Sequence, residues 1–167
     1  MSATAIELLA EVETLPDEWA LVVLDRALVA GHCSLRELVA AAHHLPERVQ
    51  WLVVIADARA TSTVQSLIRR AWYRAELPTP TVGRALLTPV GPVITACATD
   101  YHRFATATSA TAEQRAWLKR LGWHVLVLPE NKVLAASGSE LAEHLRAEHL
   151  QHLGTVGLGQ RPTTKPA

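Results

Sequence analysis

The residues most able to do chemistry lie at the end of one apolar stretch, Val93–Phe104, which reads VITACATDYHRF. Asp100 and His102 follow its apolar part directly, and a carboxylate and an imidazole placed together can act as metal ligands or as general acid and base. The simpler interpretation of Asp100 is a turn residue that accepts hydrogen bonds from nearby backbone N–H groups, and we favour it. The same interpretation is favoured more strongly for His102.

A second candidate group lies near the C-terminus. His144, Glu148 and His152 are spaced by four residues, so they fall on one face of a helix and could bind zinc adventitiously. A solvated polar helix face is the more common reason for this pattern. His43 and His44 are adjacent and point in different directions on a helix, so we expect no shared ion there.

Basic residues form a third group that could contact nucleic-acid phosphates. Half of the positive charge lies on eight residues, Arg69, Arg70, Arg74, Arg84, Arg103, Arg115, Lys119 and Arg120. We expect Arg69, Arg70, Arg74 and Arg103 to be the nucleic-acid-binding residues, with an ordinary solvated surface as the alternative. Sixteen basic and sixteen acidic residues cancel, and this balance argues against a dedicated, strongly basic DNA-binding domain.

Composition limits the class of protein further. The 167 residues are 49% hydrophobic and 19% charged, which is typical of one globular domain, or of a domain with a small helical addition. Cys33 and Cys97 are too few for a disulfide framework, and no apolar run approaches the roughly 20 residues that span a bilayer. We recognise no signal peptide and expect a cytoplasmic protein without a membrane segment.

The first part of the chain predicts helices only. They are expected over 3–13, 16–30, 34–44 and from Pro46 onward. Ser34 and Glu37 form a capping-box pattern that opens the third helix. The segment Trp51–Ala56 is apolar enough to be a strand instead. A helix-turn-helix around Gly31 is disfavoured, because the second helix lacks a cluster of side chains that could contact DNA.

The second part predicts a small mixed sheet with helices on both faces, so the fold class is α/β of the α+β type. The expected elements, in order, are a helix over Thr61–Glu76, strands over Val82–Thr88 and Val93–Thr99 joined by a turn at Pro89–Pro92, a helix over Thr111–Leu121, a strand over Trp123–Leu128 and a helix over Ser139–Leu150. This places a helical region at 1–58, an α/β domain at 59–152 and a flexible tail at 153–167.

Three strings in this order resemble one family. They are LVVLDRALVAGHCSLRELVAA, IADARATSTVQSLIRRAWYRAELPTP and AEQRAWLKRLGWHVLVL. Over roughly Ala5 to Leu150 the chain is similar to actinobacterial proteins that join an AbiEi-type antitoxin-like region to a Vsr-like endonuclease domain of the restriction-endonuclease-like fold. The resemblance implies a nuclease scaffold, but we expect the winged-helix module that begins such proteins to be missing.

The residues that would perform the family's metal chemistry are mostly replaced. Where the family's helix typically reads ESPLES, this chain has Thr61 and Gln65 in place of the two acids. At the strand end, where the family has an E-Y-D-like motif, the matching positions are Ala98, Thr99 and Asp100. One aspartate gives too few oxygen ligands to hold magnesium. We therefore expect no catalytic residues, with Asp100 and His102 as vestigial candidates, and neither a metal nor a cofactor.

The resulting hypothesis is a catalytically inactive, endonuclease-like protein that acts by binding. Its partner would be another protein or a second copy in a homodimer, in a regulatory or assembly role related to toxin–antitoxin, phage or plasmid biology. One alternative is a nucleic-acid-binding protein that uses a basic groove. The other is a metal-dependent nuclease with a rearranged site around Asp100 and His102.

Overall fold

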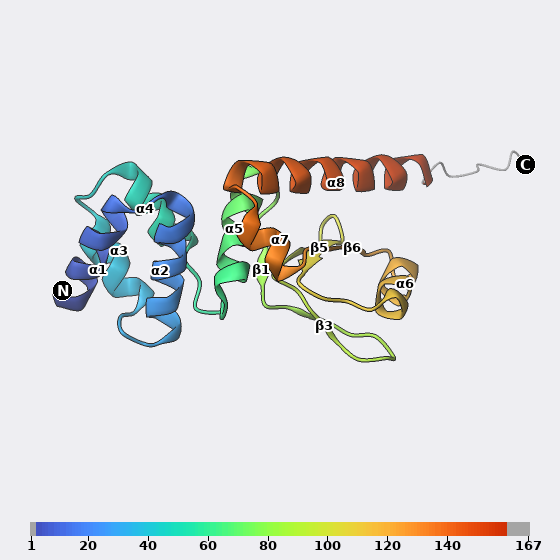
Figure 1. Cartoon of the computed structure of the whole chain (residues 1–167), viewed down its shortest axis with the longest axis horizontal. Helices are drawn as coiled ribbons and strands as arrows, with labels where there is room; N and C mark the ends of the chain where they lie inside the picture. Colours follow the sequence, from blue (N-terminus) through green and yellow to red (C-terminus); the bar gives the residue numbers. More distant parts are fainter. Residues whose placement is uncertain (1–2, 160–167) are drawn as a thin grey trace, which may run out of the picture.

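Four short helices form the first part of the protein. The computed structural model describes residues 3–159, and Figure 1 shows these helices as one compact group at the N-terminal end of an elongated molecule. They are α1 (Ala3–Thr14), α2 (Asp17–Val29), α3 (Leu35–Ala42) and α4 (Glu47–Ile55). Their buried leucine, valine and alanine side chains share one hydrophobic core. The predicted helical N-terminal region is thus confirmed.

Local signals set the limits of these helices. The Ser34 hydroxyl accepts a hydrogen bond from the backbone N–H of Glu37, whose carboxylate accepts one from the N–H of Ser34, so the predicted capping box exists. In α4, Val49, Leu52 and Val53 are buried while Val54 is 70% exposed. That spacing of three and four residues is helical, so the segment Trp51–Ala56, whose apolar character also suits a strand, belongs to a helix that ends at Ile55.

The central element is α5 (Thr63–Arg74), which Figure 1 places between the helical group and the sheet. Val64, Ile68 and Trp72 pack into the core shared with the sheet and α8. Arg69 and Arg70 are buried as well, where the sequence predicted them on the helix surface. That prediction was wrong because α5 is covered on two sides, by α2 on one and by α8 on the other.

A small mixed sheet follows, which confirms the α+β class. The strands are β1 (Thr81–Val82), β2 (Ala85–Leu86), β3 (Val93–Ile94), β4 (Cys97–Thr99), β5 (Phe104–Ala107) and β6 (His124–Val127). Four of them pair in the order β1-β4-β5-β6, and only β5 and β6 are parallel. The crossover between β5 and β6 contains α6 (Ala112–Arg120), which starts at a second capping box, Thr111 with Gln114.

The predicted hairpin around Pro89–Pro92 exists, but it is divided between two sheets. Thr81 pairs with Ala98 and Leu86 pairs with Val93, so one antiparallel register runs through both pairs of strands. It is interrupted at Gly83, whose φ of 65° lies in the left-handed region, and beyond this point β2 and β3 pair only with each other. We call the segment 85–94 the β2–β3 arm.

The stretch Val93–Phe104 is therefore not one strand. It consists of β3, then the buried and interior strand β4, a turn over residues 100–103, and the start of β5. The sequence interpretation missed β5, which lies between β4 and β6. Its four residues, FATA, contain two alanines and are too short for a clear two-residue alternation.

Two helices close the fold, α7 (Glu130–Ala135) and α8 (Gly138–Gly159). We predicted only the second of them, and ended it at Leu150. In the structure it continues through residues 153–159, which we assigned to a tail, whereas residues 160–167 lie outside the described part. Within residues 3–159, no helix has both the length and the apolar character needed to cross a bilayer.

Candidate functional site

Asp100 lies in the turn between β4 and β5, and its carboxylate forms an ion pair with the guanidinium of Arg84. The Asp100 side chain is 67% exposed. The guanidinium of Arg84 also lies over the ring of Trp123, 5.2 Å from its centroid. Asp100 thus belongs to a surface contact that links β4 and the β1–β2 connection to the start of β6, and not to a set of clustered carboxylates.

His102, two residues further on, belongs to a different group. Nδ1 of His102 lies 2.7 Å from Nε2 of His149 on α8. The backbone oxygen of His102 lies 2.8 Å from Nε2 of His152, also on α8. His149 and His152 are only 6% and 7% exposed, although histidine is a polar residue. The structure therefore joins His102 to α8, while Asp100 is joined to Arg84.

Phe104 lies at the centre of this histidine cluster, which we define as His102, His124, His149 and His152. The His124 ring stacks on Phe104 with a centroid distance of 5.5 Å and an interplanar angle of 9°. The rings of His149 and His152 contact Phe104 as well, at centroid distances of 5.2 and 6.2 Å. The four histidines come from the β4–β5 turn, β6 and α8, so only the tertiary fold brings them together.

Burial and like charge disfavour the protonated forms of two histidines in this cluster. The pKa of His149 is lowered, first by burial and then by the nearby His102 and His152. The pKa of His124 is lowered in the same way by burial, His152 and Lys119, while Glu148 acts in the opposite direction. The carboxylate of Glu148 lies 3.4 Å from Nε2 of His124.

The candidate zinc ligands on α8, for which a solvated polar face was the favoured interpretation, do not lie together. His144 lines a small pocket against α7, while Glu148 contacts His124 and His152 contacts the backbone of His102. Among residues 3–159, no three side chains of the His, Cys, Asp or Glu type are grouped so that they could hold a metal ion.

A groove adjoins the cluster between α6, β6 and α8, with a volume of about 510 Å³. Its polar lining is basic or neutral. The lining residues are Arg115, Lys119, Gly122, Trp123, His124, Val125, Gln151, His152 and Thr155. We call this feature the α6–α8 groove.

The positive charge at the groove is not neutralised within the protein. In the described part of the chain, no ion pair joins Arg115, Lys119, Arg120 or Arg103 to a carboxylate. Arg103, in the β4–β5 turn, lies next to the groove-lining Gly122, and its guanidinium donates a hydrogen bond to the carbonyl of Leu121. Unpaired cations beside a groove are able to bind an anion.

The other three arginines predicted to contact nucleic acid face the protein interior or α2. Arg69, Arg70 and Arg74 pair with Asp25, Asp17 and Glu18, all on α2. The side chain of Arg69 is 1% exposed, so it reaches no phosphate in this fold. The basic residues of α5 thus attach the helical group to the rest of the protein, and of the four arginines predicted to bind nucleic acid only Arg103 lies beside the groove.

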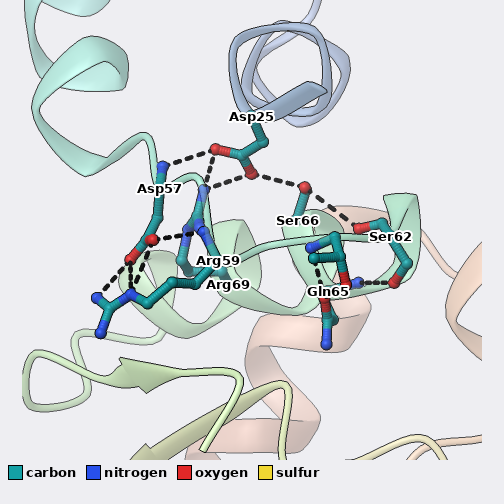
Figure 2. A network of polar contacts seen from close by, with 8 residues as sticks. Asp25, Asp57, Arg59, Ser62, Gln65, Ser66 and Arg69 are labelled. Carbon is teal, nitrogen blue, oxygen red and sulfur yellow. Dashed lines mark hydrogen bonds and ion pairs between the residues drawn. The ribbon is translucent and has the colours of Figure 1, made fainter. Parts of the chain in front are cut away.

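Figure 2 shows the polar network at this attachment. The two oxygens of Asp25 accept hydrogen bonds from the N–H of Asp57 at 2.9 Å, from the Ser66 hydroxyl at 2.6 Å, and from Arg69. Burial raises the pKa of the Asp25 carboxyl, and these donors oppose the rise. Thr61 and Gln65, the positions of the replaced acids, bond to each other, because Oε1 of Gln65 accepts from the N–H of Thr61 at 2.8 Å.

One sequence signal for the groove was missed. Residues 1–58 carry nine acidic and three basic side chains, a formal charge of −6, and residues 59–167 carry thirteen basic and seven acidic ones, a charge of +6. The neutral total hides this asymmetry between the two parts, which is typical of chains that bind nucleic acid or another polyanion. Part of it is neutralised between α2 and α5, and part remains at the α6–α8 groove.

Comparison of the chain with protein-family models, with curated proteins and with solved structures gives no match in any of the three. The resemblance to AbiEi-like and Vsr-like proteins therefore stays a prediction from the sequence. The geometry of the groove and of the histidine cluster is the basis of the functional proposals that follow.

Proposed function

We propose that this chain binds a nucleic-acid strand in the α6–α8 groove and does not cleave it. The observation that carries the proposal is a pair of cations that line the groove, Arg115 and Lys119 on α6, with Arg103 beside the lining residue Gly122; within residues 3–159 none of the three forms an ion pair. Contacts between such side chains and phosphates supply most of the affinity of non-specific nucleic-acid binding.

The residues that line the groove favour a single strand of nucleic acid over a duplex. Trp123 and Val125 line it beside the cations, and Trp117 lies on the same helix as Lys119, with the guanidinium of Arg120 over its ring at 5.0 Å. A basic groove with aromatic side chains is the usual arrangement for a single strand, whose bases are free to stack. We expect the same groove to discriminate poorly between base sequences, because phosphates carry no sequence information.

The absence of cleavage is also a proposal, and it extends the family resemblance. Cleavage with magnesium requires several carboxylates around the metal. Here Asp100 is held by Arg84, and Thr61 and Gln65 satisfy each other at the start of α5. These contacts support a nuclease-like scaffold kept for binding, in a regulatory role of the kind that antitoxin-like, phage or plasmid proteins perform.

Fluorescence anisotropy with labelled single-stranded DNA and RNA tests the binding. We expect affinity that falls steeply with salt, and a loss of about tenfold in the double variant Arg115→Ala, Lys119→Ala, with a shallower salt dependence. Arg36→Ala is the matched control, because Arg36 is an exposed arginine on α3 that forms no ion pair within the described residues. No binding at low salt, or equal losses in both variants, contradicts the proposal. If the groove binds phosphorylated peptides instead, such peptides should displace the labelled nucleic acid in a competition experiment.

Incubation with magnesium or manganese tests the absence of cleavage. We expect single- and double-stranded DNA to remain intact over hours. Metal-dependent cleavage that disappears in Asp100→Ala would show that the chain is a nuclease with a rearranged site.

A second proposed function is self-association through the β2–β3 arm. On its outer face Leu87, Val90 and Ile94 are 74%, 43% and 53% exposed, and no charged residue occurs from Ala85 to Thr99. A separate two-stranded sheet is marginal in water, and an uncharged apolar ribbon favours pairing with further strands. We propose a second copy as the occupant, because an uncharged patch complements itself across a two-fold axis.

Light scattering on a size-exclusion column tests the self-association. We expect a dimer at micromolar concentration for the unaltered protein and a monomer for the double variant Leu87→Ser, Ile94→Thr. Leu134→Ser is the control, since Leu134 is also exposed, at 55%, but lies on α7. A monomer at all concentrations refutes a dimer.

A further inference from the structure

We infer that the α6–α8 groove recognises a terminal phosphate group, on a nucleic-acid end or on a free nucleotide, and that His124 and His152 take up protons as this group binds. The inference rests on the proposed function and names the chemical group that the groove selects. It comes from the acceptor oxygens that already face one nitrogen of each histidine ring.

The backbone oxygen of His102 determines which ring nitrogen of His152 carries a hydrogen. This oxygen can only accept a hydrogen bond, so Nε2 of His152, which lies 2.8 Å away, must carry the hydrogen. In the neutral ring, Nδ1 then has a lone pair and no hydrogen. His152 can therefore donate a hydrogen bond to an anion only after it takes up a second proton.

The same reasoning applies to His124. Its Nε2 faces the carboxylate of Glu148 at 3.4 Å, and a carboxylate accepts hydrogen bonds. The second ring nitrogen of His124 becomes a donor only on protonation. In the neutral form, neither histidine that lines the groove has a second N–H to donate to an anion, and each gains one when its other ring nitrogen takes up a proton.

The cationic groups are concentrated at one place. The ring centroids of His124 and His152 are 5.2 Å apart, and Lys119 is close enough to His124 to lower its pKa. Arg115 lies one helical turn from Lys119 on α6, so the two share a face. A terminal phosphate carries nearly two negative charges near neutral pH, while a phosphodiester carries one. A cluster of cationic groups therefore favours the terminal phosphate over a phosphodiester.

Several further groups act on the two histidines from the surrounding elements. Arg115 and Lys119 belong to α6, Glu148 and His149 to α8, and His102 to the β4–β5 turn. Lys119 disfavours protonation of His124 while the groove is empty, and Glu148 favours it. A bound phosphate dianion favours the protonated forms of the two histidines. Affinity should rise as the pH falls from about 8 to about 6.5, and fall again once the phosphate itself is protonated near pH 6.

The test uses the full chain and a short oligonucleotide labelled at its 3′ end, with either a phosphate or a hydroxyl at its 5′ end. At about pH 6.5 we expect the phosphorylated end to bind about tenfold more tightly, with a smaller advantage at pH 8. His152→Gln and His124→Gln should lose the advantage, and His144→Gln, on α8 but outside the groove, should keep it. His124 is half-buried, so its variant preserves the readout if the buried His152 proves essential for folding.

Competition separates the two sources of the phosphate. Displacement of the oligonucleotide by inorganic phosphate shows that the phosphate alone is recognised, and displacement only by a nucleoside monophosphate shows that the base contributes; both support the inference. Equal affinity for phosphorylated and hydroxyl ends at both pH values overturns it but leaves salt-dependent binding, and with it the proposed function, intact. No binding of either oligonucleotide at low salt overturns both.

Discussion

The carboxylate of Asp25 on α2 and the guanidinium of Arg69 on α5 form an ion pair with side chains that are 0% and 1% exposed. They belong to the contact between α2 of the helical group and α5, part of which Figure 2 shows. Two nitrogens of Arg69, Nε and Nη1, are buried without a hydrogen-bond partner among the described residues. The pair therefore has a high desolvation cost and incomplete compensation.

Removing one partner of this pair should be more damaging than removing both. We expect Arg69→Met to lower the free energy of unfolding by about 3–5 kcal/mol, because it leaves a buried carboxylate without its cation. The double variant Asp25→Leu, Arg69→Met should recover most of this loss. Urea unfolding followed by circular dichroism measures both, and a double variant no more stable than Arg69→Met would contradict the explanation.

Stability should fall in mild acid because of the histidine cluster. The pKa of His149 is lowered in the folded state, so the unfolded chain binds more protons between that pKa and the ordinary value of 6.5. The contribution is fully present above about pH 7 and is lost as the pH falls below 6.5. The free energy of unfolding of His149→Gln should depend less on pH than that of the unaltered protein between about pH 7 and 5. Equal slopes for the two proteins would exclude His149 as the cause.

The capping box at Ser34 should have a measurable effect on α3. Ser34→Ala removes the acceptor for the N–H of Glu37, and we expect a loss of about 1 kcal/mol in the free energy of unfolding. Ser34→Asp keeps an acceptor at the same place and should retain most of the stability. If both substitutions have the same effect, the hydroxyl does not act as a cap.

Replacement by alanine at two glycines should change the stability of the protein in opposite directions. Gly122 has a φ of 82°, and a Cβ there would lie 3.1 Å from Nη1 of Arg103, so Gly122→Ala should destabilise by about 1 kcal/mol or more. Gly154 lies within α8 with no atom within 4 Å of such a Cβ, so Gly154→Ala should stabilise by about 0.5–1 kcal/mol. Thermal unfolding of the two variants side by side distinguishes the effects, and a loss in both would show that Gly154 has an unrecognised contact.

Local sequence patterns determined most of the helices. Buried positions at spacings of three and four residues, capping boxes at Ser34 and Thr111, and Gly31 and Gly122 with positive φ mark helix positions and ends within a few residues of the observed ones. These signals act over one or two turns, so they operate in any tertiary context. The short strands β1 to β5 were less clear, because two to four residues give little periodicity.

The roles of the charged and polar side chains depended on the tertiary structure. Nothing within α5 shows that Arg69 meets Asp25, 44 residues earlier in the chain. Nothing within the β4–β5 turn shows that Arg103 lies beside Gly122 with no carboxylate partner among residues 3–159. The histidine cluster joins residues 102, 124, 149 and 152 from three separate elements. The sequence by itself determined the helices and the class of fold, because those depend on neighbouring residues. Only the packing of distant segments decided which charges are neutralised inside the protein and which remain at the α6–α8 groove to meet a ligand.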